Sequence, residues 1–175
     1  MTSVSGRRVQ SAERLPAAFA ALPPKQRTLF RAARTLLRNR FPTANELAYD
    51  YGFAVLVAYA PAEQGKDAIL SLRASDKGVS LYFSQGPKLP DPKRLLRGSA
   101  TQVRYIALES ARQLSDPDVE ALIAATLAQA RIPFPATGKG TVIIKTDGTQ
   151  KSKTGTAKKT RAATPKRSKP PAKKK

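Results

Sequence analysis

The chain has 175 residues, contains no cysteine and no histidine, and carries a formal net charge of +20 from 32 Lys and Arg against 12 Asp and Glu. The missing residue types exclude disulfide frameworks, zinc fingers, thiol nucleophiles and imidazole bases. A cationic excess of this size favours polyanionic partners over neutral metabolites.

Residues 1–14 are polar, and we expect them to form a flexible N-terminus. The apolar run 15–22 that follows is flanked by prolines and has Glu13 just upstream, so it makes a poor signal peptide. No stretch approaches the roughly 18 consecutive apolar residues of a membrane span. We therefore expect a cytoplasmic protein with no membrane partner, associated with the nucleoid if its polyanion is DNA.

The first long element is an amphipathic helix that starts after the break at Pro23 and Pro24 and runs to Arg40. Its apolar residues recur at helical spacing, and Phe41–Pro42 ends it.

Four arginines of this helix are spaced four, three and four residues apart, which places them on one stripe. They are Arg27, Arg31, Arg34 and Arg38. Such a stripe is able to track a phosphate backbone; the alternative is the ordinary solvent-facing side of an amphipathic helix. The stripe lacks the interleaved acids that favourable pairing along a purely solvating face would use.

An antiparallel meander is predicted next, from three runs with strand character. Residues 53–59 are apolar on both faces, as in a central strand, and 68–73 follow them. Residues 77–84 alternate, with Val79, Leu81 and Phe83 on one face.

The densest group of aromatic and carboxylate side chains, Tyr49, Asp50 and Tyr51, directly precedes the first of these runs. Its members could hydrogen-bond a small ligand, or the aromatic rings could simply pack at the core and its edge. One carboxylate without a His, a Cys or a second acid forms no acid–base pair. We therefore expect no enzyme activity, no cofactor and no metal site.

Two Asp–Pro pairs predict helix starts, because Asp is a favourable N-cap and Pro fits the first helical position. Asp91–Pro92 predicts a short helix over 93–97, and Asp116–Pro117 begins a longer one after a predicted strand at 102–108. Strands grouped together indicate an α+β single domain with one mainly antiparallel sheet and helices packed on one face.

Residues 136–149 are predicted to be a linker with one short strand at the apolar island 142–144. The preceding residues 138–141, Gly-Lys-Gly-Thr, contain part of a phosphate-binding loop. They lack its first glycine and its magnesium-binding hydroxyl, so we reject a Walker motif.

Residues 150–175, which we name the Lys-rich tail, contain no large apolar residue and are predicted to be disordered. Its cations are Lys151, Lys153, Lys158, Lys159, Arg161, Lys166, Arg167, Lys169, Lys173, Lys174 and Lys175. They predict nonspecific, salt-sensitive contact with the phosphates of DNA or RNA; the alternative is a solvated segment that keeps the protein soluble. The tail has no aromatic residue for base stacking.

Two blocks of the chain resemble a known family. Gly86–Pro92 with Leu95–Ser99, and then Gln102–Ile106 with Leu108–Ser110, are similar to the bacterial YdhG-like domain of unknown function. The resemblance implies a YdhG-like α+β fold over about residues 15–135, and leaves the Lys-rich tail outside the domain. Part of that family carries an iron-chaperone label, which would require exposed carboxylates.

The resulting expectation is a non-enzymatic protein attached to nucleic acid through the Lys-rich tail. The alternative is a small-ligand or iron-binding module in which the tail is incidental. The residues leave open both the oligomeric state and the choice between DNA and RNA.

Overall fold

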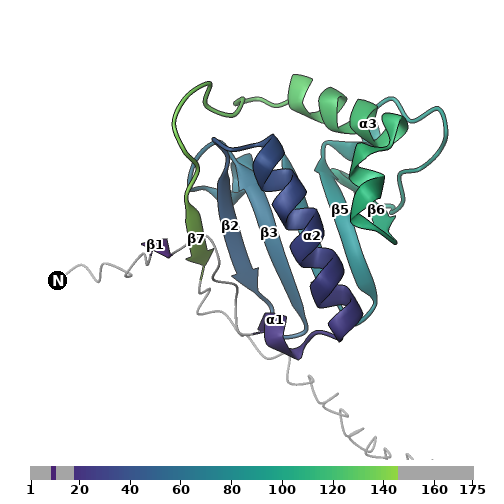
Figure 1. The fold of residues 1–175 in the computed structure, drawn as a ribbon. Helices are drawn as coiled ribbons and strands as arrows, with labels where there is room; N and C mark the ends of the chain where they lie inside the picture. Colours follow the sequence, from purple (N-terminus) through teal and green to yellow (C-terminus); the bar gives the residue numbers. More distant parts are fainter. Residues whose placement is uncertain (1–8, 11–17, 146–175) are drawn as a thin grey trace, which may run out of the picture.

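A seven-stranded sheet forms the centre of the structure, which is a computed structural model that describes residues 9–10 and 18–145 (Figure 1). The strands are β1 (Val9–Gln10), β2 (Asn45–Asp50), β3 (Ala54–Ala60), β4 (Leu70–Ser75), β5 (Gly78–Ser84), β6 (Val103–Leu108) and β7 (Val142–Lys145). The helices are α1 (Ala18–Ala21), α2 (Pro24–Arg40) and α3 (Pro117–Ala128), with short 3₁₀ turns η1 (Gly65–Asp67), η2 (Gly86–Lys88) and η3 (Ala111–Ser115).

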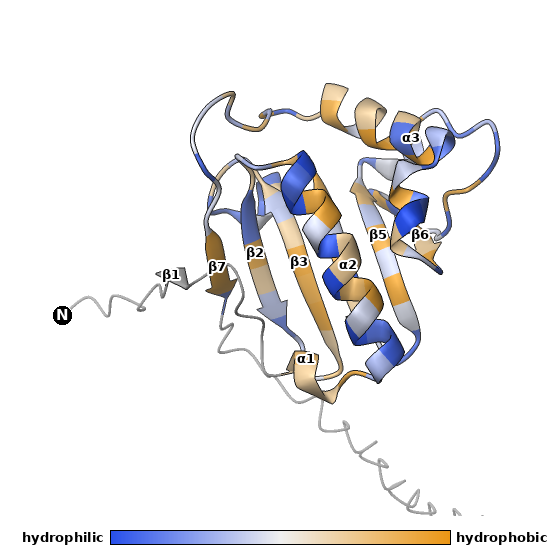
Figure 2. Cartoon of the chain, in the orientation of Figure 1, coloured by the Kyte–Doolittle hydropathy of each residue, from blue (hydrophilic) through white to orange (hydrophobic). Residues whose placement is uncertain are grey.

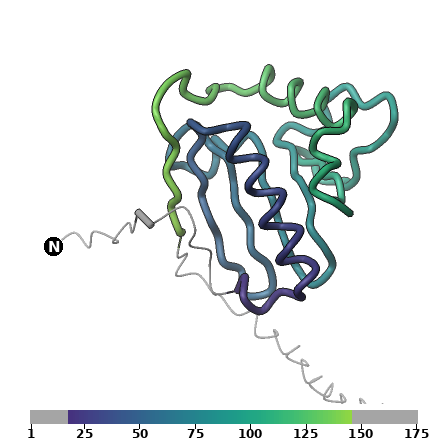
Figure 3. The backbone as a smooth tube through the Cα atoms, viewed as in Figure 1, coloured from purple at the N-terminus to yellow at the C-terminus, as the bar shows by residue number. Residues whose placement is uncertain are grey.

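The strands lie in the order β1-β7-β2-β3-β4-β5-β6, and neighbours from β2 to β6 pair antiparallel in sequence order. The chain then passes through α3 and returns across the end of the sheet to β7, as the backbone trace in Figure 3 shows. β7 enters beside β2 and pairs parallel with it, while β1 pairs antiparallel with β7. The predicted α+β class and the mainly antiparallel sheet are confirmed.

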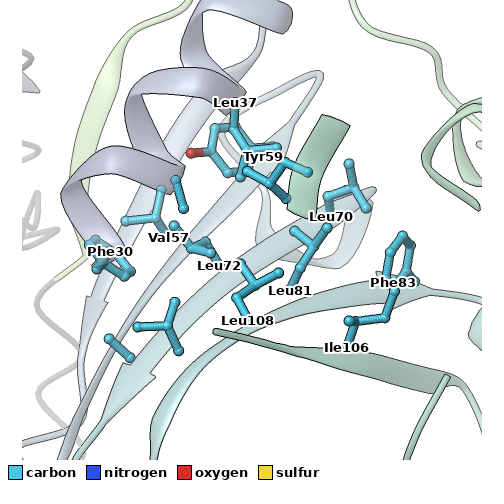
Figure 4. Packing of buried hydrophobic residues seen from close by; sticks show 14 of the residues in the cluster. Phe30, Leu37, Val57, Tyr59, Leu70, Leu72, Leu81, Phe83, Ile106 and Leu108 are labelled. Carbon is cyan, nitrogen blue, oxygen red and sulfur yellow. The ribbon is translucent and has the colours of Figure 1, made fainter. Parts of the chain in front are cut away.

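Helix α2 lies across one face of the sheet and buries its apolar side there (Figures 1 and 2). Pro24 takes the first helical position and Phe41 caps the end, as the sequence predicts. Phe30, Ala33 and Leu37 are fully or almost fully buried against the strands. The side chains labelled in Figure 4 come from α2 and from strands β3 to β6, which together form the main core.

The predicted meander corresponds to β3, β4 and β5. Val79, Leu81 and Phe83 all face the main core, so the alternation of β5 is confirmed. The predicted strands at 102–108 and 142–144 correspond to β6 and β7, and the second Asp–Pro pair begins α3.

The short helix predicted over 93–97 is wrong. Both Asp91 carboxylate oxygens accept backbone N–H groups, from Leu95 and Leu96 at 2.8 Å each. Arg94 adopts a left-handed conformation, with a φ of 54°. That conformation ends the turn after Asp91, because a right-handed helix cannot continue through it.

Strands β1 and β2 are the strands that the sequence prediction missed, and β1 lies within residues 1–14, which were expected to form a flexible N-terminus. None of the described helices is long and apolar enough to cross a bilayer.

Candidate nucleic-acid interface

The arginine stripe of α2 is largely engaged in contacts inside the domain. Arg34 is only 6 % exposed and donates to both Glu46 carboxylate oxygens, with its shortest contact at 2.6 Å. Arg38 adds a 3.0 Å bond to the same carboxylate. The expectation of an exposed guanidinium stripe is therefore wrong at Arg34, because a carboxylate from β2 lies underneath the helix.

The other two arginines of the stripe contact α1. The Arg27 guanidinium donates to the Ala20 carbonyl oxygen at 2.9 Å. Arg31 lies over the Phe19 ring at 5.1 Å, within the range of a cation–π contact. These arginines hold α1 against α2 in the described structure, and their use in phosphate binding stays a prediction.

The Glu46 carboxylate also influences Tyr59, which faces it from β3 in the cross-strand register. Burial raises the pKa of the Tyr59 hydroxyl well above its ordinary value of 10.0, and the Glu46 negative charge raises it further. Arg34 and Arg38 oppose the shift without cancelling it. Tyr59 is thus a neutral core residue throughout the physiological range.

The group at Tyr49, Asp50 and Tyr51 is organised by its carboxylate. Asp50 accepts the Ala18 N–H at 3.0 Å and the Gly52 N–H at 2.8 Å. It therefore fixes the start of α1 and the turn between β2 and β3. The rings of Tyr49 and Tyr51 stack with centroids 6.2 Å apart and planes 9° from parallel. The three residues do lie together, but the Asp50 carboxylate accepts hydrogen bonds from backbone N–H groups of its own domain.

An exposed aromatic ring stands beside this group. Phe53 is 71 % exposed, the largest exposure among the large hydrophobic residues of the described chain. Its centroid lies 6.4 Å from that of Tyr51, and the Arg73 guanidinium lies over the ring at 5.9 Å. Exposed aromatic rings next to a cation are typical of binding surfaces.

The face of the sheet opposite α2, which we name the outer face, has a distinctive composition. Side chains that are paired across strands point to the same face, so the register defines its members. They are Asn45, Leu47, Tyr49, Ala54, Leu56, Ala58, Ala60, Ser71, Arg73, Ser75, Ser80, Tyr82, Ser84, Val103, Tyr105, Ala107, Ile143 and Lys145, with Gly78. In strands β2 to β7 this face contains no acidic residue, whereas Glu46 and Asp50 point to the helix side.

The outer face is divided into a closed and an open half. On the β7, β2 and β3 side, Leu47, Ala58, Ala60 and Ile143 form a second buried cluster, against which Ala68 of the β3–β4 loop packs. On the β4, β5 and β6 side, Ser71, Arg73, Ser80, Tyr82 and Tyr105 are all partly exposed. The half formed by β4 to β6 is accordingly accessible to a ligand.

Tyr82 and Tyr105 form a stacked pair at the centre of this open half. Their centroids are 5.2 Å apart and their planes differ by 28°. Arg97 extends the same row, since it pairs with Tyr105 through two backbone hydrogen bonds of 2.8 and 3.0 Å. The next residue is Gly98, with a φ of 102°. A Cβ there would lie 3.3 Å from the Tyr105 ring, so glycine lets the chain approach the ring.

Sequence reasoning placed Tyr82 on the face opposite Val79, Leu81 and Phe83, but did not identify it as a site. The Tyr82–Tyr105 pair depends on the register of β5 with β6. Because 18 residues separate the two strands, a local sequence pattern does not show that register. The alternation of Ser80, Tyr82 and Ser84 was the available signal.

Two clefts border the sheet. One of about 450 Å³ lies where the β3–β4 loop, the start of β6 and the end of α3 meet, and Lys66, Lys88 and Arg131 line it together with Asp67. Gln85 also lines it and adopts a left-handed conformation with a φ of 58°. Its size is in the range of small-ligand sites.

The second cleft, of about 670 Å³, lies beside Arg38, Glu46 and residues 138–142. Gly140 serves the fold: its N–H donates to the Pro42 carbonyl at 2.8 Å, and a Cβ on Gly140 would lie 1.8 Å from the Ala44 carbonyl oxygen. The segment leads directly into β7. Its backbone geometry supports the rejection of a phosphate-binding loop.

Within residues 9–10 and 18–145, no three or more Asp or Glu side chains gather to form a metal site. The eleven cations of the Lys-rich tail lie outside the described residues.

No family model matches the chain, and neither does any curated protein or any solved structure.

Proposed function

We propose that this protein binds nucleic acid without reading its sequence, through the Lys-rich tail and the outer face of the sheet. The observation that carries the proposal is the composition of that face, which holds Arg73, Lys145 and a tyrosine pair but no carboxylate in strands β2 to β7. A face of this composition attracts a polyanion and repels other cationic surfaces.

The charge balance supports the same proposal. Residues 18–145 contain 18 Lys and Arg against 10 Asp and Glu, a net charge of +8. Several of the acids are already engaged: Glu46 by two arginines, Glu120 by Arg40, and Asp118 by Lys93. Each of these pairs also engages at least one cation, so the net charge of +8 is carried by the remaining basic residues.

The mechanism is counterion release. Each Lys or Arg that neutralises a phosphate releases a condensed cation, so the logarithm of the affinity falls with the logarithm of salt by about 0.9 per contact on duplex DNA. Contacts of about 6 to 10 residues would lower the affinity roughly 10³- to 10⁵-fold between 50 and 200 mM salt. The eleven cations of the Lys-rich tail are sufficient for that number.

The test replaces those eleven residues with Gln in the full-length chain and titrates duplex DNA at several salt concentrations. We expect the salt slope of the variant to fall by more than half. In the matched control, the Ser and Thr residues of the same segment become Ala, which preserves the charge, and the slope should not change. Equal slopes for wild type and the Gln variant would overturn the role of the tail.

We further propose that the domain is YdhG-like, on the residues 86–110 that carry the resemblance. Support comes from the grouping of five consecutive antiparallel strands, β2 to β6, before α3, which agrees with the fold that the resemblance implies. The proposal places the protein in the cytoplasm, in contact with chromosomal DNA or with RNA.

A second candidate function is small-ligand binding in the 450 Å³ cleft. It is favoured by Gln85, because a left-handed conformation in a non-glycine residue is costly and is often retained at binding sites. The three cations of the lining select an anionic ligand. A rise in melting temperature with inorganic phosphate or nucleoside monophosphates, abolished by Arg131→Gln, would favour this function over the first.

A further inference from the structure

We propose that the open half of the outer face binds single-stranded nucleic acid, with bases stacked on Tyr82, Tyr105 and Phe53. This inference rests on the proposed function and adds to it the class of nucleic acid and the residues that distinguish that class.

The first stacking position is the tyrosine pair. Tyr82 and Tyr105 project from adjacent strands in direct register, and their near-parallel rings lie 5.2 Å apart. The residues around them are small: Ser71 is opposite Tyr82 on β4, and Ser80 and Ala107 pair with each other two positions along. The Tyr105 ring lies between Tyr82 and Gly98, so the position for a stacked base is the face of Tyr82 that turns away from Tyr105, next to the small residues of β4.

The second position is Phe53, whose ring is largely exposed and lies beneath the Arg73 guanidinium. Together with Tyr51, which is 44 % exposed, Phe53 forms an exposed aromatic cluster, and exposed apolar clusters mark binding surfaces. Phe53 precedes the row Ala54–Ser75–Gly78, which lies four residues, roughly 13 Å, along β5 from Tyr82. The three interstrand spacings of about 4.8 Å from β6 to β3 make the surface roughly 14 Å wide across the strands. That width suits two or three bases, the number that other open sheets bind through aromatic residues.

Cations are placed to contact the phosphates between these bases. Arg97 lies in the Tyr82–Tyr105 row at the β6 edge, and Arg73 lies in the next row on β4. These rows contain no acidic residue in the described strands, and the nearest acid of the adjoining loop, Asp67, lies in the bordering cleft. Both chemical parts of a single strand, the bases and the phosphates, therefore have matching groups.

A duplex fits this surface poorly. Its bases are stacked on one another inside the helix and cannot reach aromatic rings on a sheet. The Lys-rich tail, by contrast, contacts phosphates in either form. The Lys-rich tail would therefore bind single and double strands alike, whereas contact with the aromatic residues of the outer face would require unpaired bases.

The experiment titrates the full-length protein with a twelve-nucleotide oligo(dT) and with a twelve-base-pair duplex. The chain has five Tyr and no Trp, so its fluorescence is the sum over five tyrosine rings, two of which are Tyr82 and Tyr105. We expect quenching by the oligo(dT), and much less by the duplex. Stacking contributes about 1–3 kcal/mol per base, so the double variant Tyr82→Leu with Tyr105→Leu should bind oligo(dT) roughly 5- to 150-fold more weakly.

Two controls accompany this variant. Replacing both tyrosines with Phe retains the aromatic faces and should preserve the affinity for oligo(dT). Phe53→Ser alters a ring that is already 71 % exposed, so it keeps the fold and should weaken oligo(dT) binding by itself even if the double Leu variant does not fold.

The outcomes separate this inference from the proposed function. Failure of the wild type to bind either nucleic acid would overturn both. Binding of both with identical affinities in the wild type, the Leu variant and Phe53→Ser would overturn the stacking inference and leave the proposed function intact. Equal loss of duplex and oligo(dT) binding in the Leu variant would overturn the preference for single strands. Loss of self-association in that variant, without a change in DNA binding, would assign the face to a second copy of the chain and also overturn the inference.

Discussion

Glu46 is the residue that most clearly links the helix to the sheet. Its side chain is only 3 % exposed, and it accepts hydrogen bonds from Arg34 and Arg38. Removing one partner of a buried ion pair leaves the other charge uncompensated, which costs about 3–5 kcal/mol. We expect Glu46→Gln to lower the free energy of unfolding by about that amount, measured by urea denaturation at pH 7.

Glu120 supplies the matched control, because it also pairs with an arginine of α2 but is 40 % exposed. Glu120→Gln should cost less than about 1 kcal/mol, as is usual for surface ion pairs. Similar losses for the two variants would contradict a special role for the buried pair.

Tyr59 predicts a dependence of stability on alkaline pH. Burial, and then the Glu46 charge, raise its pKa in the folded protein above the ordinary value of 10.0. Below about pH 10 the hydroxyl is protonated in both states, so its contribution to stability is constant. Above pH 10 the unfolded state ionises first and gains stability, so the folded protein loses stability as the pH rises.

Tyr59→Phe should therefore flatten the decline in the free energy of unfolding between pH 10 and 11.5, relative to its value at pH 8. Tyr82→Phe removes a partly exposed hydroxyl and is the control, which should retain the decline of the wild type. An unchanged alkaline slope in Tyr59→Phe would contradict the raised pKa.

Among the helices and strands, the sequence predicted those whose single buried face gives the apolar residues a regular spacing. α2 shows a helical apolar repeat, and β5 alternates because one face is buried and the other is not. β2 was missed because its sequence, Asn-Glu-Leu-Ala-Tyr-Asp, contains amide and acid residues that are depleted in strands. Its buried Glu46 is acceptable only because Arg34 and Arg38 lie above it, and that pairing across elements is invisible in a local pattern.

The same distinction between local patterns and contacts across elements applies to the residues of the candidate site. The charge of the chain and the crowding of aromatic residues at Tyr49 to Phe53 could be predicted from the sequence. The burial of Arg34 could not, since helical spacing shows that four arginines share a stripe but not what lies opposite it. The Tyr82–Tyr105 pair required the register of β6, which the long connection after β5 conceals.

β7 is short, but it lies between β1 and β2 in the sheet and pairs with both. Ile143 is completely buried in the second cluster, beneath the closed half of the outer face. Truncation of a buried Ile costs about 2–5 kcal/mol, so Ile143→Ala should lower the free energy of unfolding by that amount. Ile132→Ala, at a position 41 % exposed, should cost under about 1 kcal/mol, and equal costs would place β7 outside the cooperative fold.

For the whole molecule, the charge of +20 has a consequence for stability as well as for binding. Like charges repel more strongly in the folded state, where they are closer together, and salt screens that repulsion. The screening length falls from about 30 Å at 0.01 M to about 8 Å at 0.15 M ionic strength. We therefore expect the melting temperature to rise by several degrees over that range, by an amount on the order of 1 kcal/mol in stability.

The variant with Gln at the eleven cations of the Lys-rich tail has a net charge of +9 and separates two sources of this effect. If the tail contributes to the electrostatic field around the domain, the melting temperature of this variant should rise clearly less with salt than that of the wild type. Identical salt responses would mean that the repulsion arises within residues 18–145. The tail would then affect nucleic-acid binding without affecting the stability of the fold. The Ser and Thr to Ala control should follow the wild type in either case, because its charge is unchanged.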